Sequence, residues 1–449
     1  MPGLVGPDEV RRIAGAALEL PGVDGVEVLF MHGWGGLTRF ASSAIHQSTS
    51  SEDTGLRVRV VKGGRIGVAA TNDFSSEGAR RAAESAREMV EVAAPDPLFP
   101  GLAPPAPVPE GDRYDEATAS TTPEERAEGV AQLVARCGEG FTAAGAYETN
   151  AAEVAVANTE GQFCWAPSTQ ASLTTVISGG DGGHGFAEIF AAATREVDPE
   201  AVARRAADKA VRSQRPRDLD PGRYTVVLEP SAVSTLVGFL AWIGFGGRAL
   251  LEERSCFSGK QGQPVVADEV TIYDDASSPL TLGIPFDFEG VPRRRVDLVK
   301  DGVFLDAVYD LRTAKQAGTQ TTGHALPAPN PEGPFPLNLF MEPGQASLEE
   351  LVAGTERGVL VTRFHYSNVV HQVESTITGM TRDGTFWIED GEVRHPVKNL
   401  RFTQSILEAL SNTAEIGRAT ELASEFFLSA SRVPALRIGS FNFTGRSDH

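Results

Sequence analysis

The chain has 449 residues, of which 41% are hydrophobic and 22% are charged, as is usual for a globular protein in water. Its formal net charge is -20, which argues against nucleic-acid binding because neutralising phosphates requires clustered Lys and Arg. The length exceeds that of one typical domain, so more than one domain is expected.

Cysteine usage and the apolar runs indicate the compartment. Cys137, Cys164 and Cys256 are far apart and form no CxxC pair, so neither a disulfide framework nor a zinc knuckle is predicted. The N-terminus lacks the pattern of a signal peptide. The longest apolar run, Leu236–Phe245, is about half as long as a membrane span requires. We therefore expect a cytoplasmic protein with no membrane partner.

The first part of the chain carries helix and strand patterns. An amphipathic helix is predicted from Pro7 to Leu20. The stretches VEVLFMHGW, LTRFASSAIHQ, LRVRVVKGG and IGVAATND alternate between apolar and polar residues and are predicted to be strands. Helical spacing follows at 75–93. Residues 1–94 are thus predicted to form an α+β subdomain, followed by a Pro-rich linker at 95–112.

The remainder predicts a middle subdomain and a larger final domain. A helix beginning near Thr122, the strands YETNAAEVAVANTE and GQFCWAPSTQASLTTVIS, and a helix at 199–213 make residues 113–220 a second α+β subdomain. A strand, TVVLEP, then precedes a helix predicted at 231–253. Many short strands separated by turn signals follow, so residues 221–449 are predicted to be a β-rich C-terminal domain.

The stretch VTRFHYSNVVHQVES contains two histidines near a glutamate, which raises the question of a metal site. On a straight strand His365 and His371 would lie about 20 Å apart, at roughly 3.3 Å per residue. A zinc ion requires both ring nitrogens within about 2.1 Å. Only a bend at 367–368 could bring them together, so histidines that line a groove or are hydrogen-bonded locally are favoured.

A glycine-rich loop offers a second candidate. GGDGGHG, at 179–185, formally contains GxGxxG, but no βαβ repeat surrounds it. A mobile loop is therefore favoured over a nucleotide site, which stays open as an alternative. GxSxG, HExxH, DxDxDG and GxxxxGK[ST] do not occur in the sequence. The residues alone therefore indicate no catalytic centre.

Several segments, taken in order, resemble the TldD/TldE (PmbA) family over nearly the whole chain. In the N-terminal part these are TRFASSAIHQ and LRVRVVKGGRIGVAATND. In the C-terminal part they are VVLEPSAVSTLVGFL, SCFSGKQGQPVVADEVTIYDD, GIPFDFEGVPRRRVDLVKDGVFLDAVYDLRTAKQAG, TTGHALP, PLNLFMEPG, ERGVLVTRF, GMTRDGTFWIEDGEVRHPVKNLRFTQSILEALSN and PALRIGSFNFTG.

The resemblance implies a TldD/PmbA-like α+β fold whose β-rich C-terminal domain forms a cleft. It also implies a cytoplasmic heterodimeric metallopeptidase in which the TldD-type subunit binds zinc through HExxxH and the TldE (PmbA) type lacks these ligands. Counting back from FSG at 257–259, the motif falls on Gly238, Phe239 and Ile243, which cannot bind zinc. The chain thus resembles the TldE type, and its apolar helix would serve core packing or a subunit interface.

The resemblance further implies no metal in this chain, zinc in a TldD-type partner, and unfolded, small or modified peptides as substrates. The segments 321–344 and 179–185 are candidate cleft walls, and a private metal site built with His324 stays open. Two alternatives also stay open: a self-sufficient hydrolase or tailoring enzyme of a natural-product pathway, and a non-proteolytic peptide-binding scaffold. The substrate-cleft candidates are His324, Phe364, His365, Tyr366, Asn368 and His371.

Overall fold

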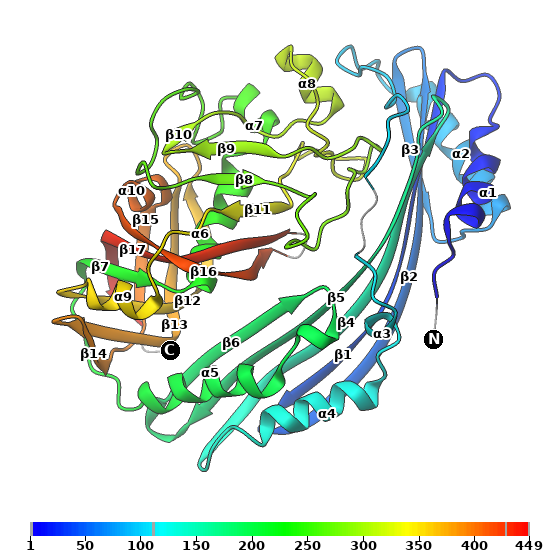
Figure 1. The fold of residues 1–449 in the computed structure, drawn as a ribbon. Coiled ribbons are helices and arrows are strands. Elements are labelled where there is room, and N and C mark those ends of the chain that lie inside the picture. Colours follow the sequence, from blue (N-terminus) through cyan, green and yellow to red (C-terminus); the bar gives the residue numbers. More distant parts are fainter. Residues whose placement is uncertain (1–2, 110–112, 427–428, 448–449) are drawn as a thin grey trace.

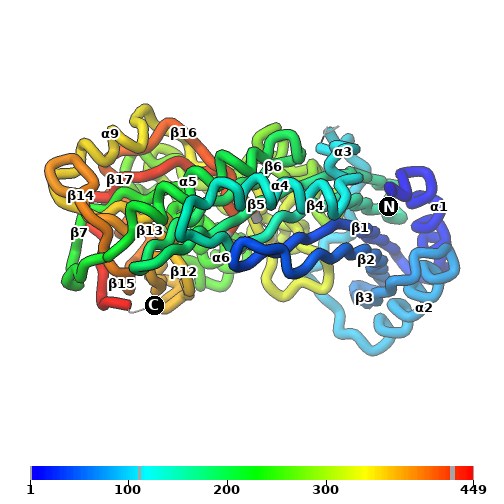
Figure 2. Tube along the Cα trace, turned by 90° about the horizontal axis from the view of Figure 1, so that it is seen from below, coloured from blue at the N-terminus to red at the C-terminus, as the bar shows by residue number. Residues whose placement is uncertain are grey.

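The computed structural model describes residues 3–109, 113–426 and 429–447. Its fold is α+β, as predicted, with a curved antiparallel sheet in the N-terminal half and a mixed sheet in the C-terminal half (Figure 1). Seen from below, the molecule is elongated, with the first two helices at one end and the C-terminal strands at the other (Figure 2).

The N-terminal sheet has the order β3-β2-β1-β4-β5-β6 and joins strands from both predicted subdomains. Val28 in its centre lies opposite Val58 on one side and Ala157 on the other, so apolar side chains meet on one face. Its strands are β1 Gly25–Ala41, β2 Ala44–Lys62, β3 Arg65–Thr71, β4 Phe141–Asn158, β5 Phe163–Gly179 and β6 His184–Ala191.

Strand β1 corrects two expected strands: it runs without a break from the first into the second, and the second, LTRFASSAIHQ, turns at Ser42 and Ser43 into β2. The glycines in MHGWGG do not form a turn; they allow other groups to approach closely. A Cβ on Gly35 would lie 2.2 Å from Oδ1 of Asn150, and one on Gly36 would lie 2.1 Å from Nη2 of Arg126. The strand therefore continues through the glycines.

Helices cover this sheet in two pairs. α1 and α2 pack on the part formed by β1–β3, and α4 and α5 pack around the opposite end of the strands (Figure 1). The predicted start near Thr122 is confirmed, since its side chain and that of Glu125 form a reciprocal capping box. The helices are α1 Pro7–Leu18, α2 Ser76–Val92, α3 Glu116–Ala119, α4 Pro123–Val134 and α5 Pro199–Arg212.

The Pro-rich segment runs without regular structure from the start of β3 to the end of β4. Its described residues, 95–109, form no helix or strand apart from one bridge between Pro95 and Arg65. Side-chain amides hold it in place: Asn158 Nδ2 donates to the carbonyl of Ala103. The segment therefore lacks regular secondary structure, as its proline content predicts.

The C-terminal sheet has the order β10-β9-β8-β11-β17-β15-β13-β12-β7, with β14 beside β13 and β16 beside β17. Since β17 also pairs with β7, the strands β7, β12, β13, β15 and β17 close into a ring. The strands are β7 Gly222–Leu228, β8 Ile272–Asp274, β9 Val296–Lys300, β10 Val303–Phe304, β11 Asn338–Met341, β12 Arg357–His371, β13 Thr376–Glu389, β14 Glu392–Pro396, β15 Leu400–Ser405, β16 Thr413–Phe426 and β17 Ser429–Arg446.

The helix predicted at 231–253 is two helices, which is a second correction. The chain leaves the helical path at Gly244, whose carbonyl accepts a hydrogen bond of 2.7 Å from Ser255 Oγ. This turn lets Phe245 stack on Phe257, with ring centroids 5.0 Å apart. The helices of this half are α6 Pro230–Ile243, α7 Gly247–Leu251, α8 Leu311–Ala317, α9 Leu348–Ala353 and α10 Ile406–Ser411.

Candidate functional site

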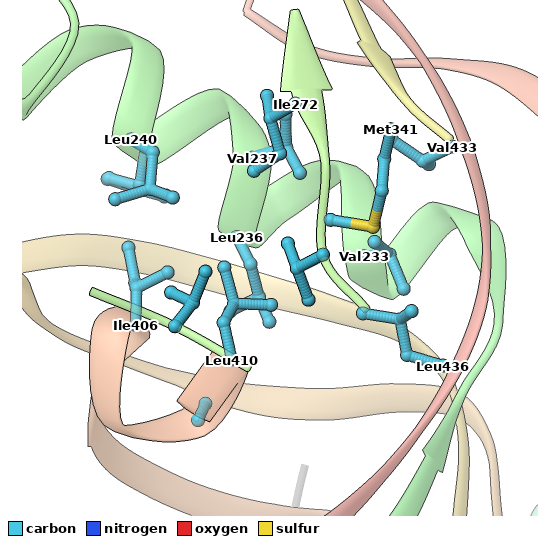
Figure 3. Packing of buried hydrophobic residues seen from close by; sticks show 14 of the residues in the cluster. Val233, Leu236, Val237, Leu240, Ile272, Met341, Ile406, Leu410, Val433 and Leu436 are labelled. Carbon is cyan, nitrogen blue, oxygen red and sulfur yellow. The ribbon is translucent and has the colours of Figure 1, made fainter. Parts of the chain in front are cut away.

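Helix α6 occupies the place where the resemblance puts the zinc-binding motif. Its side chains pack against α10, β8, β11 and β17 in the main hydrophobic core (Figure 3). Phe239 and Ile243 are buried there, and Gly238 offers no side chain. None of the three carries a nitrogen, oxygen or sulfur side-chain atom, so this helix does not fit a zinc ion. Trp242, by contrast, is 47% exposed at the C-terminal end of the helix.

His324 lies in the interior, with no exposed surface. Its Nδ1 is 2.9 Å from the carbonyl of Thr322, and its Nε2 is 2.9 Å from Oδ1 of Asp274. Burial lowers the pKa of His324, while the Asp274 carboxylate opposes that shift. With both nitrogens engaged, His324 has none free for a metal, so the structure does not favour a private metal site built on it.

The other cleft candidates lie on β12, and they do not all face the same way. Phe364 is buried against Phe402 and Phe441. The pairing with β13 is irregular between His365 and Asn368, where Tyr366 adopts a positive φ of 51°. A bend at 367–368 was named only as the condition for bringing His365 and His371 onto one metal ion, and the strand is irregular at this point.

The exposed candidates are found around this irregularity. Tyr366 is 77% exposed, and Asn368 and His371 are also exposed. The ring centroids of His365 and Tyr366 lie 4.5 Å apart. Burial lowers the pKa of His365, and the nearby Arg charges lower it further. The structure therefore places five of the six candidates along β12 and His324 in a separate buried network. Their role in a cleft stays a prediction.

The glycine-rich loop is the turn between antiparallel strands β5 and β6. A short 3-10 turn at 180–182 joins the strands, whereas a dinucleotide loop would lead from a strand into a helix. The nucleotide alternative is therefore wrong. His184 at the start of β6 is 2.9 Å from Ser178 Oγ, and it lines a cavity of about 250 Å³ with Asp383 and Lys398.

Two side-chain hydrogen bonds connect the N-terminal half of the chain to the start of α6 in the C-terminal half. Lys209 Nζ on α5 donates to Glu229, the residue that precedes α6, over 2.5 Å. Ser231 Oγ donates to Glu188 on β6 over 2.7 Å. Burial raises the pKa of Glu188 to about 7, against the effect of the Ser231 hydrogen bond. These residues were not singled out in the sequence, although Glu188 and Glu229 each stand beside apolar residues, a pattern that could have indicated buried carboxylates.

In the part of the chain that the structure describes, no three His, Cys, Asp or Glu side chains are grouped closely enough to hold a metal ion. Across the same residues, every helix is too short or too polar to pass through a bilayer.

Three family models match this chain in succession. They are the PmbA/TldA metallopeptidase domain 1 at residues 26–90, the central domain at 114–214 and the C-terminal domain at 221–445. The chain therefore belongs to the PmbA/TldD metallopeptidase family. The matched ranges lie within the three units expected from the sequence, whose boundaries stay predictions.

Relatives and solved structures resemble the chain along most of its length. It is 24% identical to "Metalloprotease PmbA" of Escherichia coli, covering 96% of each chain, and 26% identical to a "Metalloprotease" of Methanothermobacter thermautotrophicus, covering 85% of each. The structure of TldE from Thermococcus kodakarensis superimposes with a TM-score of 0.88 at 21% identity, over 98% of this chain and 99% of that one. The structure of a Thermotoga maritima protein superimposes with a TM-score of 0.87 at 20% identity, over 97% of this chain and 100% of that one.

Proposed function

We propose that this chain is the subunit without zinc ligands in a TldD/TldE-type heterodimeric metallopeptidase that cleaves unfolded, small or modified peptides in the cytoplasm. The observation that carries the proposal is α6, which has Gly238, Phe239 and Ile243 where the family motif has ligands and base, and which is packed into the core. A TldD-type partner would hold the zinc ion. Metal chemistry therefore belongs to the partner, and this chain contributes binding surface.

The contribution of this chain would be to complete the substrate cavity and to hold the peptide. Tyr366, Asn368 and His371 are exposed on β12 and can contact a bound chain. Phe364 supports this surface from the core. An extended peptide that pairs its backbone with a strand edge is bound with little dependence on its sequence, which suits varied peptide substrates.

Exposed apolar side chains suggest where the partner binds. Trp242 at the end of α6 is 47% exposed, and Tyr366, Val370 and Val373 at the end of β12 and in the following turn are 77%, 56% and 47% exposed. α6 packs against β12, so these positions lie on neighbouring elements. Exposed aromatic and aliphatic groups of this kind are typical of protein interfaces.

The test compares the isolated chain, an isolated TldD-type HExxxH chain and their mixture. Elemental analysis and cleavage of unfolded peptides should find zinc in the complex and activity only in the mixture, and a chelator should abolish that activity. Tightly bound metal together with cleavage by the isolated chain would instead support a self-sufficient hydrolase. A zinc-replete mixture that binds peptides without cutting them would support a scaffold.

A matched pair of variants tests the proposed surface. Val370→Asp should weaken association at least tenfold, because it places a charge among exposed apolar groups. Val92→Asp changes another exposed valine, on α2, and should leave association unchanged. If titration calorimetry gives the two variants equal affinities for the TldD-type partner, the partner does not bind at the β12 surface.

A further inference from the structure

Strand β2 is paired along only part of its outer edge. β1 pairs with the whole of β2, but β3 pairs only with residues 56–62, in the part of β2 that packs on α2 (Figure 1). Residues 44–53 are all exposed, so the described part of the chain leaves this edge open. Backbone N–H and C=O groups along the edge therefore face solvent and are available to a further strand.

This edge lacks the residues that usually prevent strand pairing. Natural edge strands are commonly protected by Lys, Pro or a bulge. The stretch AIHQSTSSEDTG, residues 44–55, contains no Lys, Arg or Pro. Its register with β1 shifts at His46, and from Gln47 to Gly55 the pairing is regular. This regular part is as long as a typical strand.

A cavity of about 360 Å³ lies beside the same edge. Residues 50–52 of β2 form one side of it and are exposed, so the cavity is reached from the edge. Trp34 of β1, Ala119 of α3 and Pro123 of α4 give it an apolar lining. Arg126 also lines it, but its guanidinium donates to Thr149 Oγ1 and to a backbone carbonyl. The cavity therefore suits an apolar side chain.

Side chains of β2 alternate between the cavity side and the opposite face. Ser48 lies on the cavity side, because its Oγ is 3.1 Å from Oγ1 of Thr38, which accepts from the cavity residue Arg126. Ser50 follows on the same side, whereas Asp53 points to the other face. A strand added beside β2 would therefore place alternate side chains over the cavity and on the face of Asp53.

The charges along this edge indicate which occupant fits. Glu52 and Asp53 are the only Asp, Glu, Lys or Arg residues between positions 44 and 55, and both are exposed. The whole chain has a net charge of -20. A second copy of the chain would bring the same two carboxylates to the edge, so self-pairing is disfavoured. Basic side chains would instead be attracted.

We propose that the edge of β2 at residues 47–55 binds an extended basic peptide segment. The peptide backbone pairs with β2, alternate apolar side chains enter the cavity beside Trp34, and the basic side chains between them face Asp53. Backbone pairing supplies affinity, and the cavity and the carboxylates select the segment. This site lies on the N-terminal sheet and depends neither on the β12 surface nor on the proposed peptidase partner.

The experiment measures binding of the blocked peptide acetyl-Lys-Leu-Lys-Leu-Lys-amide to the isolated full chain by titration calorimetry. The peptide should bind, and its analogue with Glu in place of Lys should bind about tenfold more weakly or worse. An extended peptide turns the N–H groups of its leucines to one edge and those of its lysines to the other. Methylation of both leucine nitrogens, or of two lysine nitrogens, should therefore give one form that loses about tenfold in affinity and one that binds like the parent.

Matched variants locate the site. Ser50→Trp fills the cavity side and should weaken binding about tenfold, whereas Thr49→Trp, on the opposite face of the same exposed stretch, should bind as wild type. Asp53→Lys should weaken binding about five- to tenfold. Glu84→Lys makes the same change in net charge at an exposed position of α2 and should leave binding unchanged.

Several results would overturn the proposal. They are absence of binding by wild type, equal binding of the basic and acidic peptides, and equal affinities of the two methylated forms. Equal affinities within either pair of variants would also exclude this edge. If the isolated chain sediments as a dimer that Ser50→Trp dissociates, a second copy occupies the edge and the proposal is wrong.

Discussion

Replacing Glu27 by Gln should make the protein more resistant to unfolding at alkaline pH. Glu27 on β1 is 3% exposed and shares Arg59 with a second buried carboxylate, Glu289. Two negative charges thus face one positive charge in the interior. Burial raises the pKa of Glu27 to about 7; the charge of Glu289 adds to this rise, while Arg59 opposes it.

The sign and size of the effect follow from this pKa. The folded protein keeps a proton on Glu27 between its ordinary value of 4.5 and about 7, where the unfolded chain has lost it. Stability from this group is therefore fully present below pH 4.5 and is lost as the pH rises through 7. At about 1.4 kcal/mol for each pH unit, the loss amounts to about 3 kcal/mol.

Urea unfolding of Glu27→Gln and wild type at pH 5 and pH 8 measures this loss. Glutamine resembles the protonated carboxyl, so the two free energies of unfolding should agree within about 1 kcal/mol at pH 5. The variant should be more stable by about 2–3 kcal/mol at pH 8. Glu84→Gln, on the exposed side of α2, should show the same difference at both pH values. A Glu27 variant that is equally destabilised at both would mean that Glu27 is ionised throughout, and would refute the argument.

Three further substitutions test the packing described above, each by the free energy of unfolding in urea. Gly36→Ala should cost about 1–3 kcal/mol, because its Cβ would displace Arg126 from its buried hydrogen bonds; a neutral result would contradict the close approach. Thr122→Ala should cost about 1 kcal/mol through loss of the cap of α4, and no cost would mean that the capping box is not formed. Phe257→Ala should cost about 3–5 kcal/mol, since its buried ring stacks between two others; a cost below 1 kcal/mol would disprove tight packing there.

Local signals in the sequence predicted much of the fold. The cap at Thr122 depends on residues three positions apart, and the alternation in β4 and β5 is continuous, so both were visible. The break in the predicted helix at Gly244 was missed because it accompanies the stacking of Phe245 on Phe257, a residue that is distant in the sequence. The continuity of β1 through Gly35 and Gly36 was missed for the same reason, since the side chains that fill the space come from other elements.

The candidate sites were less predictable because they combine distant segments. Tyr366 and its neighbours could be named, as they are adjacent in the sequence and match family segments. The hydrogen bond between Ser231 and Glu188 could not, because it joins β6 to the start of α6 and forms only when the two halves of the chain pack together.

The pairing of β17 with β7 has a consequence for how this protein can be divided. Gly222, where the C-terminal half begins, lies opposite Phe443, close to its end. The polypeptide thus enters and leaves this half at neighbouring points, an arrangement that favours circular permutation. A short linker could join these two ends, and new termini could then be opened in the turn at 372–374, where Val373 and Glu374 are exposed, leaving every strand of the ring uncut.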